Sequence, residues 1–215
     1  MRRIWLLLII MLSQAIILTG SREAPTLTEL LKRHNAQLTV RHAESESELL
    51  KHMAATGYTA RLIAFTTGVI VKQDLLDKLK LKPYNFHPGP PTYPGRYPEA
   101  WGVYQEARWF GSTAHQMVRL VDEGPIVDID MFEVPAGADR FDMAKLCYGS
   151  VTRLFQRLSP VLATSTEDLP LREDLQWSGR KWRLADYENL RDHPPADDEV
   201  ERLRRFNSFG PPSAR

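Results

Sequence analysis

Apolar runs typical of strands alternate with helical patterns through the first 81 residues of this chain. Strand-type runs are expected at residues 16–19, 37–40 and 61–65. Leucine and methionine at helical spacing predict helices at residues 26–34, 44–53 and 72–81. Strands that alternate with helices indicate βαβ units, so we predict an α/β, Rossmann-like fold with a mainly parallel sheet and flanking helices. In such sheets, ligands bind beyond the carboxyl ends of the strands.

The second half of the chain opens with residues 83–98, which are rich in proline and glycine. Proline fixes φ and removes a backbone donor, so we expect an ordered loop here, neither a helix nor a central strand. Beyond it the patterns predict helices at residues 99–107 and 139–158, and strands at residues 114–120 and 126–132. Residues 165–215 are polar, contain proline and show little periodicity. We therefore divide the chain into an apolar extension (1–15), a catalytic domain (16–160) and a short C-terminal extension (161–215).

Composition limits the classes of function. Hydrophobic residues make up 43% and charged residues 26% of 215 residues, as in ordinary globular proteins. The net charge of +1 provides no global field that would attract nucleic acid or an anionic membrane. Cys147 is the only cysteine, so neither an intrachain disulfide nor a cysteine zinc cluster can form. This cysteine usage fits a reducing compartment, and we expect a cytoplasmic protein.

The N-terminus supports an alternative location. Arg2 and Arg3 precede the apolar run 4–12, and Ser13-Gln14-Ala15 is similar to a cleavage site, as in a signal peptide. The run is too short for a confident transmembrane helix. Export or membrane tethering therefore stays open beside two other interpretations, an extended first strand and a start codon assigned too far upstream.

An amide, an imidazole and a carboxylate stand in glycine- or proline-marked segments at Asn85, His87 and Asp122. Such a set suits an acyl transfer, which needs a donor for an oxyanion and a carrier for a proton. Each residue alone also has a structural explanation: an asparagine turn, a surface loop histidine and a hairpin turn. The sequence offers no tight cluster of histidine and carboxylate, so we expect no metal.

Two motifs together resemble the folate-dependent formyltransferase family. The first is Asn85-x-His87-Pro88. The second reads Gly111-x-Thr113-x-His115-x-x-Val118-x-x-x-Asp122-x-Gly124-Pro125-Ile126, and the similarity is densest from about residue 61 to residue 135. The resemblance implies a formyltransferase fold with Asn85, His87 and Asp122 as the catalytic residues. His115 would support Asp122.

The resemblance also implies the chemistry. A primary amine would attack the formyl carbon of 10-formyltetrahydrofolate while Asn85 donates to the oxyanion. His87 would add a second donor or supply a proton, and Asp122 would hold His87 charged and help to deprotonate the amine. Backbone groups of two turns would bind the pterin. Those turns contain Gly68, Val69 and Ile70, and Val121 and Gly124.

We expect the acceptor to be the amine of a sugar nucleotide or another small metabolite. Alternatives are glycinamide ribonucleotide, methionyl-tRNA and a non-catalytic protein that binds folate or a nucleotide. Nucleic acid is disfavoured by the net charge of +1, and we also consider a homodimer. Residues 177–181 and 201–206 faintly resemble the segment that follows the catalytic domain in sugar and tRNA formyltransferases.

Overall fold

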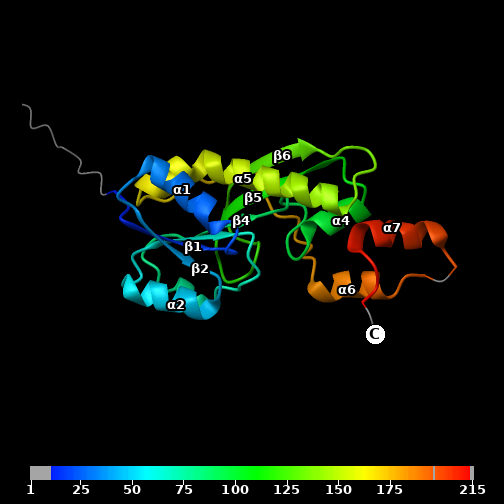
Figure 1. The fold of residues 1–215 in the computed structure, drawn as a ribbon, viewed down its shortest axis with the longest axis horizontal. Helices are drawn as coiled ribbons and strands as arrows, with labels where there is room; N and C mark the ends of the chain where they lie inside the picture. The colour runs from blue at the N-terminus through cyan, green and yellow to red at the C-terminus, as the bar shows by residue number, and fades with distance from the viewer. Residues whose placement is uncertain (1–10, 196, 214–215) are drawn as a thin grey trace, which may run out of the picture. The chain divides into compact units, whose positions relative to one another are not determined.

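The computed structural model describes residues 11–195 and 197–213, so most of the expected apolar extension lies outside the described residues (Figure 1). The chain divides into two compact units. Unit 1 contains the chain up to Pro83 together with Gln156–Leu169, and unit 2 contains Tyr84–Phe155 and the chain from Pro170 onward. The expected domain limits at residues 15 and 160 stay a prediction.

Parallel strands form the centre of unit 1. β1 (Gln14–Leu18) pairs in parallel with β2 (Thr39–Ala43) on one side and with β3 (Arg61–Phe65) on the other. The helices of the unit are α1 (Ala24–His34), α2 (Glu46–Ala55) and the short α3 (Gln73–Leu76). Crossover connections between parallel strands are right-handed. The chain crosses from β1 to β2 and then back to β3, so α1 and α2 cover opposite faces of the strands, as Figure 1 shows.

The elements expected in unit 1 are confirmed with one exception. The strand at residues 61–65 has the predicted bounds, and its five residues are all buried, as expected of a strand covered on both faces. The expected helix at 72–81 is wrong in length, because α3 ends at Leu76. Lys80 N–H donates to the carbonyl of Tyr58 at 3.0 Å, so the backbone beyond α3 pairs with another turn instead of continuing the helix.

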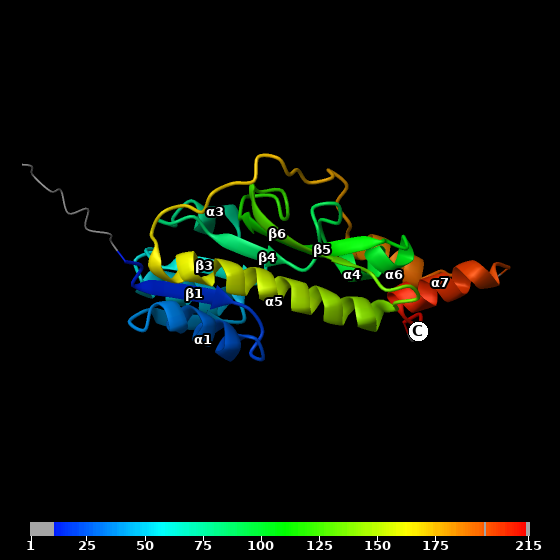
Figure 2. The same ribbon diagram turned by 90° about the horizontal axis from the view of Figure 1, so that it is seen from above.

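Antiparallel strands form the centre of unit 2. β4 (Tyr84–His87), β5 (Trp109–Gln116) and β6 (Ile126–Glu133) lie side by side, with β5 in the middle (Figure 2). The α/β class is confirmed, but the expected mainly parallel sheet is corrected to a mixed arrangement, parallel in unit 1 and antiparallel in unit 2. The short connection 117–125 explains the direction of β6, because a parallel return would need a crossover of a dozen or more residues.

Along the chain, one helix of unit 2 lies between β4 and β5, and the others follow β6. They are α4 (Pro98–Tyr104), the first part of α5 (Arg140–Thr164), α6 (Leu184–Asp192) and α7 (Glu199–Phe209). From Gln156 onward, α5 belongs to unit 1. α4 lies where a helix was expected at residues 99–107.

The prediction of a loop throughout residues 83–98 is wrong for its first part, which is β4. Tyr84–His87 contains neither proline nor glycine, so every backbone N–H of this segment is free to pair. The pairing partner is β5, with Asn85 opposite His115 and His87 opposite Thr113. The turn begins only at Pro88. Asn85 and His87 therefore stand on a strand and not in the expected ordered loop.

The prediction that the long helix ends before Pro160 is also wrong, because α5 continues through this proline to Thr164. Proline has no N–H and would leave the carbonyl of Gln156, four residues earlier, without its helical donor. The Ser159 hydroxyl donates to that carbonyl at 2.8 Å. This local replacement lets the helix continue.

The C-terminal residues contain more structure than their low periodicity indicated. Phe209, at the end of α7, is buried against Trp101 and Tyr104 of α4, with ring centroids 5.0 and 5.2 Å apart. The hydroxyl of Tyr104 also donates to Glu201 at 2.7 Å. One aromatic side chain and an ionic network hold α7 in place, so the helix needs few apolar residues. Its apolar pattern is therefore too sparse to predict a helix.

Candidate active site

The core of the candidate site is one face of the β4–β5 pair. Successive side chains on a strand point to opposite faces, so Asn85 and His87 share a face, and their cross-strand neighbours His115 and Thr113 share it too. On the other face, Phe86 packs against Phe155 with ring centroids 5.1 Å apart. This apolar contact fixes the strand and thereby the direction of the polar side chains.

Asp122 reaches the same place from the connection between β5 and β6. Its φ of 51° lies in the left-handed region, which aspartate tolerates better than most residues. The connection is closed by Gln116 N–H, which donates to the carbonyl of Pro125 at 2.9 Å. Gly124 is required here, because a Cβ at this position would collide with the carbonyl of Gln116. A register shift at Ala114/His115 marks a bulge beside the site.

The structure brings the four predicted residues of the catalytic and supporting set together. Asp122 Oδ1 lies 3.3 Å from His115 Nε2, and Asp122 Oδ2 lies 3.5 Å from His87 Nδ1. Asn85 Nδ2 lies 3.0 Å from His115 Nε2 and 3.4 Å from Asp122 Oδ1. Asp122, His87 and His115 are 3%, 4% and 2% exposed, whereas Asn85 is half-buried. One carboxylate thus contacts two imidazoles and an amide away from bulk water.

Backbone carbonyls determine which ring nitrogens carry hydrogen. His87 Nε2 lies 2.9 Å from the carbonyl of Tyr93, which only accepts, so this nitrogen donates. By the same argument His115 Nδ1 donates to the carbonyl of Gln116 at 2.9 Å. In the neutral ring, His115 Nε2 is then an acceptor for the Asn85 amide. The side chain of Asn85 is thereby oriented with its nitrogen towards His115 and Asp122.

Burial and charge act in opposite directions on the two central groups. Burial lowers the pKa of His87, while Asp122 and the Tyr93 carbonyl act to raise it. Burial acts to raise the pKa of Asp122, but His87, His115 and the Gly95 N–H together hold it well below its usual range. The carboxylate is therefore ionised, and burial favours the neutral form of His87.

Besides the backbone carbonyl of Tyr93, two contributors to the site were not predicted from the sequence. Gly95 N–H donates to Asp122 Oδ2 at 2.9 Å. Gly95 has a φ of 106°, and a Cβ there would meet the backbone of Trp182. The indole of Trp177 packs against both imidazoles. The Pro94-Gly95 pair is a turn signal that could have indicated the role of Gly95. Trp177 lies far from the other site residues in the sequence, and no signal marks it.

The residues expected to bind the pterin lie in turns of the two units. In unit 1, Gly68, Val69 and Ile70 follow β3; Val69 N–H donates to Thr67 Oγ1 at 3.1 Å, and the Ile70 side chain is exposed. In unit 2, Val121 is exposed, and the carbonyl of buried Gly124 accepts from Trp177 Nε1 at 2.8 Å. Their role in binding a cofactor stays a prediction.

Neither a metal-binding cluster nor a membrane-spanning helix is present in the described part of the chain. Among residues 11–195 and 197–213, no group of three or more histidine, cysteine, aspartate and glutamate side chains is arranged to hold a metal ion. No helix among these residues is long and apolar enough to cross a bilayer. The expected cytoplasmic location stays a prediction.

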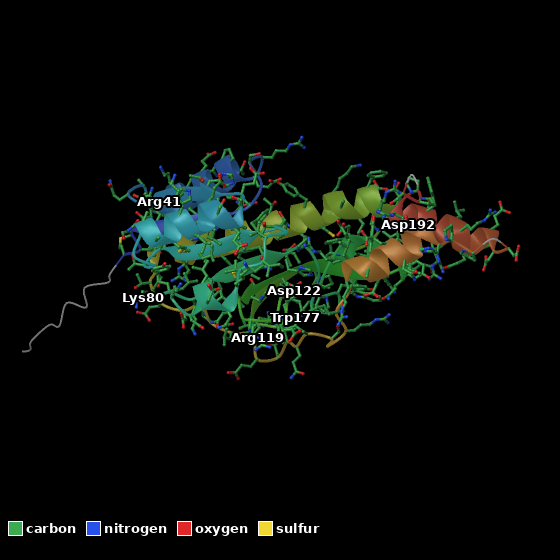
Figure 3. The ribbon with its side chains drawn as sticks, turned by 90° about the horizontal axis from the view of Figure 1, so that it is seen from below. Arg41, Lys80, Arg119, Asp122, Trp177 and Asp192 are labelled. Carbon is green, nitrogen blue, oxygen red and sulfur yellow. The ribbon has the colours of Figure 1, made fainter. Side chains whose placement is uncertain are left out.

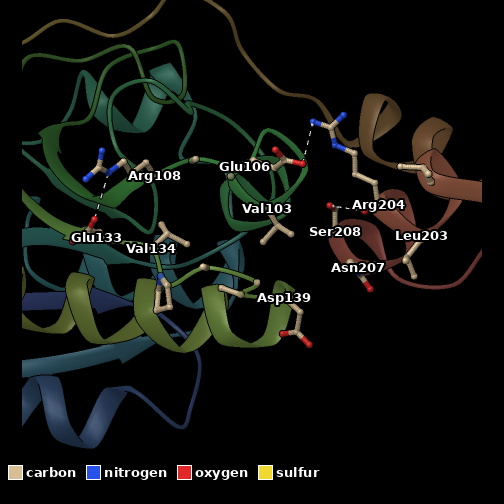
Figure 4. A pocket seen from close by; sticks show the side chains of 17 residues that line it. Val103, Glu106, Arg108, Glu133, Val134, Asp139, Leu203, Arg204, Asn207 and Ser208 are labelled. Atoms are coloured by element: carbon tan, nitrogen blue, oxygen red, sulfur yellow. Dashed lines mark hydrogen bonds and ion pairs between the residues drawn. The ribbon is translucent and has the colours of Figure 1, made fainter.

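A hollow of about 710 Å³ lies elsewhere in unit 2, between the end of α4, the loop before α5, and α7 (Figure 4). Its rim carries the exposed ion pairs Arg108–Glu133 and Arg204–Glu106. It contains none of the predicted site residues. The candidate active site is therefore identified by its buried polar cluster and not by the size of a hollow.

Comparison by sequence gives one curated relative. The methionyl-tRNA formyltransferase of Bifidobacterium adolescentis is 34% identical over 94 residues, which are 43% of this chain and 29% of that protein. The match thus spans less than a third of the relative. No protein-family model matches the chain.

Comparison by structure covers most of the chain. A 4-N formyltransferase from Francisella tularensis superposes with a TM-score of 0.73 at 14% identity, over 92% of this chain and 88% of that one. A formyltransferase from Anoxybacillus kamchatkensis, solved with UDP-4,6-dideoxy-4-formamido-L-AltNAc and tetrahydrofolate, superposes with a TM-score of 0.66 at 15% identity, over 92% and 98%. The predicted Rossmann-like fold is confirmed as the fold of these formyltransferase structures.

Proposed function

We propose that this protein is an N-formyltransferase that moves the formyl group of 10-formyltetrahydrofolate to a primary amine of a sugar nucleotide or another small metabolite. The observation that carries the proposal is the buried cluster of Asn85, His87, His115 and Asp122 on the β4–β5 face. The fold shared with structures that contain a sugar nucleotide and tetrahydrofolate supports the choice of substrates.

Asn85 is the residue that donates a hydrogen bond to the formyl oxygen. It is the most exposed member of the cluster, and its amide makes one short contact to His115 and one longer contact to Asp122, at 3.0 and 3.4 Å. A formyl oxygen replaces Asp122 as the second acceptor and becomes negative as the amine attacks. Because His115 already holds the amide, the donor needs little reorganisation in the transition state.

Asp122 and His87 carry out the proton transfers of the reaction. The attacking amine becomes an ammonium group in the tetrahedral adduct and must lose a proton, while the departing nitrogen of the folate must gain one. The ionised Asp122 accepts a proton from the ammonium, directly or through water, and passes it to His87 Nδ1, which lies 3.5 Å from Asp122 Oδ2. The imidazolium so formed gives one proton to the leaving nitrogen, and both side chains regain their starting charges. Negative charge on the adduct favours the imidazolium form of His87, which burial disfavours in the free protein.

The test is a formyl-transfer assay with 10-formyltetrahydrofolate and a panel of acceptors: amino-sugar nucleotides, glycinamide ribonucleotide and methionyl-tRNA. We expect transfer to an amino-sugar nucleotide or a similar small amine, and its loss in His87→Ala. Tight folate binding by calorimetry with no transfer to any acceptor would identify a folate-binding protein instead. Transfer to methionyl-tRNA alone would contradict the proposed acceptor and leave the chemistry intact.

A further inference from the structure

Residues 172–182, called the strap below, are held by backbone hydrogen bonds on two sides of the site. Arg172 N–H donates to the carbonyl of Ile126, the first residue of β6, at 2.8 Å. On the other side, Ser178 N–H donates to the carbonyl of Pro91 at 3.0 Å, and Trp182 N–H to that of Pro94 at 2.9 Å. The strap thus joins the loop after β4 to the start of β6, next to the connection that carries Asp122.

Trp177 is the strap residue that contacts the reactive cluster. Its Nε1–H donates to the carbonyl of Gly124, two residues after Asp122, at 2.8 Å. Its ring centroid lies 5.1 Å from that of His115 and 6.0 Å from that of His87, both in edge-to-face geometry. Figure 3 shows Trp177 beside Asp122. One indole therefore contacts both imidazoles and the backbone next to the carboxylate.

We propose that Trp177 is a positioning residue of the active site, which holds the Asp122 connection in place and keeps water away from the His87–Asp122 pair. Aspartate adopts the left-handed conformation of Asp122 more readily than most residues, but at a higher energy than glycine, so the turn is better defined where its surroundings hold it. The bond from Trp177 to Gly124 supplies such a constraint within the same turn. The kinetic part of this inference rests on the proposed function.

The charged groups around His87 come from several elements. Asp122 and His115 act on it directly, the first raising and the second lowering its pKa, and the Tyr93 carbonyl accepts from its Nε2. Glu123, next to Asp122, is paired with Lys181 of the strap. The largest effect on His87 is burial, which lowers its pKa. Removing the indole that covers this ring therefore raises the pKa of His87 towards its ordinary value.

The experiment compares Trp177→Phe and Trp177→Ala in the full chain with Trp109→Phe, a change at an exposed tryptophan at the start of β5. Phenylalanine keeps an aromatic ring but loses the bond to Gly124, and we expect kcat to fall about tenfold with a smaller change in KM. Alanine removes both the aromatic ring and the bond to Gly124, and we expect kcat to fall about a hundredfold. The pKa of His87, followed by NMR titration and assigned with His87→Gln, rises in Trp177→Ala and not in Trp109→Phe.

Different outcomes separate this inference from the proposed function. If Trp177→Ala only loses thermal stability, while its pH–rate profile and the pKa of His87 match the wild type, the positioning role is wrong. If Trp177→Ala does not fold, wild-type kcat in Trp177→Phe overturns the inference. If wild-type protein transfers formyl to no acceptor, the proposed function fails. The NMR titration of Trp177→Ala still decides whether Trp177 shields His87.

Discussion

Unit 1 and unit 2 each contain an asparagine whose amide is hydrogen-bonded inside the unit, and the two side chains, one buried and one half-buried, are used differently. In unit 1, Asn35 is 7% exposed and its amide donates to the carbonyls of Leu12 and Ala163, at 2.8 and 2.9 Å. In unit 2, the amide of Asn85 faces His115 and Asp122, both of which can change charge. Asn35 joins distant parts of the backbone, whereas Asn85 belongs to a set of groups that can move protons.

The same contrast holds for buried charge. Arg61 of unit 1 is 1% exposed and donates to the carbonyls of Ser165 and Glu167, each at 3.0 Å. Asp122 of unit 2 is also buried, at 3% exposed, but its neighbours include two imidazoles. A buried polar group with backbone partners stabilises a fold, and one with titratable partners indicates chemistry. Partners, and not burial, distinguish the candidate site from the rest of the molecule.

The largest effect that would test this contrast is the loss of the Asp122 charge. Asp122→Asn keeps the shape but removes the base, and we expect kcat for formyl transfer to fall by about a thousandfold. The control is Asp142→Asn, which removes a half-exposed carboxylate next to Lys145 in α5. Wild-type activity in Asp122→Asn would show that the proposed mechanism is wrong, even if the acceptor is correct.

The next test replaces each of the two asparagines, in turn, by alanine. Asn35→Ala leaves two buried carbonyls without their donor, so we expect the free energy of unfolding to fall by about 2 kcal/mol with little change in kcat. Asn85→Ala should lower kcat by about a hundredfold, with a smaller loss of stability. Denaturant unfolding and the transfer assay are measured on both variants. Equal losses of stability and of kcat in the two variants would show that the two asparagines do not have different roles.

The sequence predicted elements well where a single periodicity dominates, as in β3. It failed at β4 because the prolines that follow obscured four residues that are free to pair, and at Pro160 because the hydroxyl of Ser159 replaces a missing donor. The side chains of the site could be predicted, since amide, imidazole and carboxylate are distinctive. The contribution of the Tyr93 carbonyl could not, because a backbone carbonyl carries no residue signature, and for the Gly95 N–H the sequence offers only the Pro94-Gly95 turn signal.

Acid should weaken unit 2 through His87. Burial lowers the pKa of His87 in the folded protein, so the unfolded chain binds more protons once the pH falls to about 6.5, the ordinary value for histidine. The free energy of unfolding therefore decreases as the pH falls below about 7, by at most about 1.4 kcal/mol per pH unit from this group. His87→Gln should flatten the decrease between about pH 7 and pH 5, above the range in which carboxylates titrate.

Chemical denaturation of wild type and His87→Gln across this pH range measures the effect. Parallel curves for the two proteins would mean that His87 is not the source of the acid sensitivity. A separate loss at lower pH is expected from Asp122, whose pKa is lowered in the folded protein. Its contribution is present above the unfolded value of 3.8 and is lost as the pH falls below it.

The smallest effects should come from surface ion pairs, in which the two units are expected not to differ. Lys72–Glu46 in unit 1 and Arg108–Glu133 in unit 2 both join largely exposed side chains. Solvent screens such pairs, so double-mutant cycles should give coupling energies below about 0.5 kcal/mol in each unit. A markedly larger coupling at Arg108–Glu133 would show that the rim of the hollow is electrostatically organised as well. The difference between the units would then extend beyond the buried cluster to the surface of unit 2.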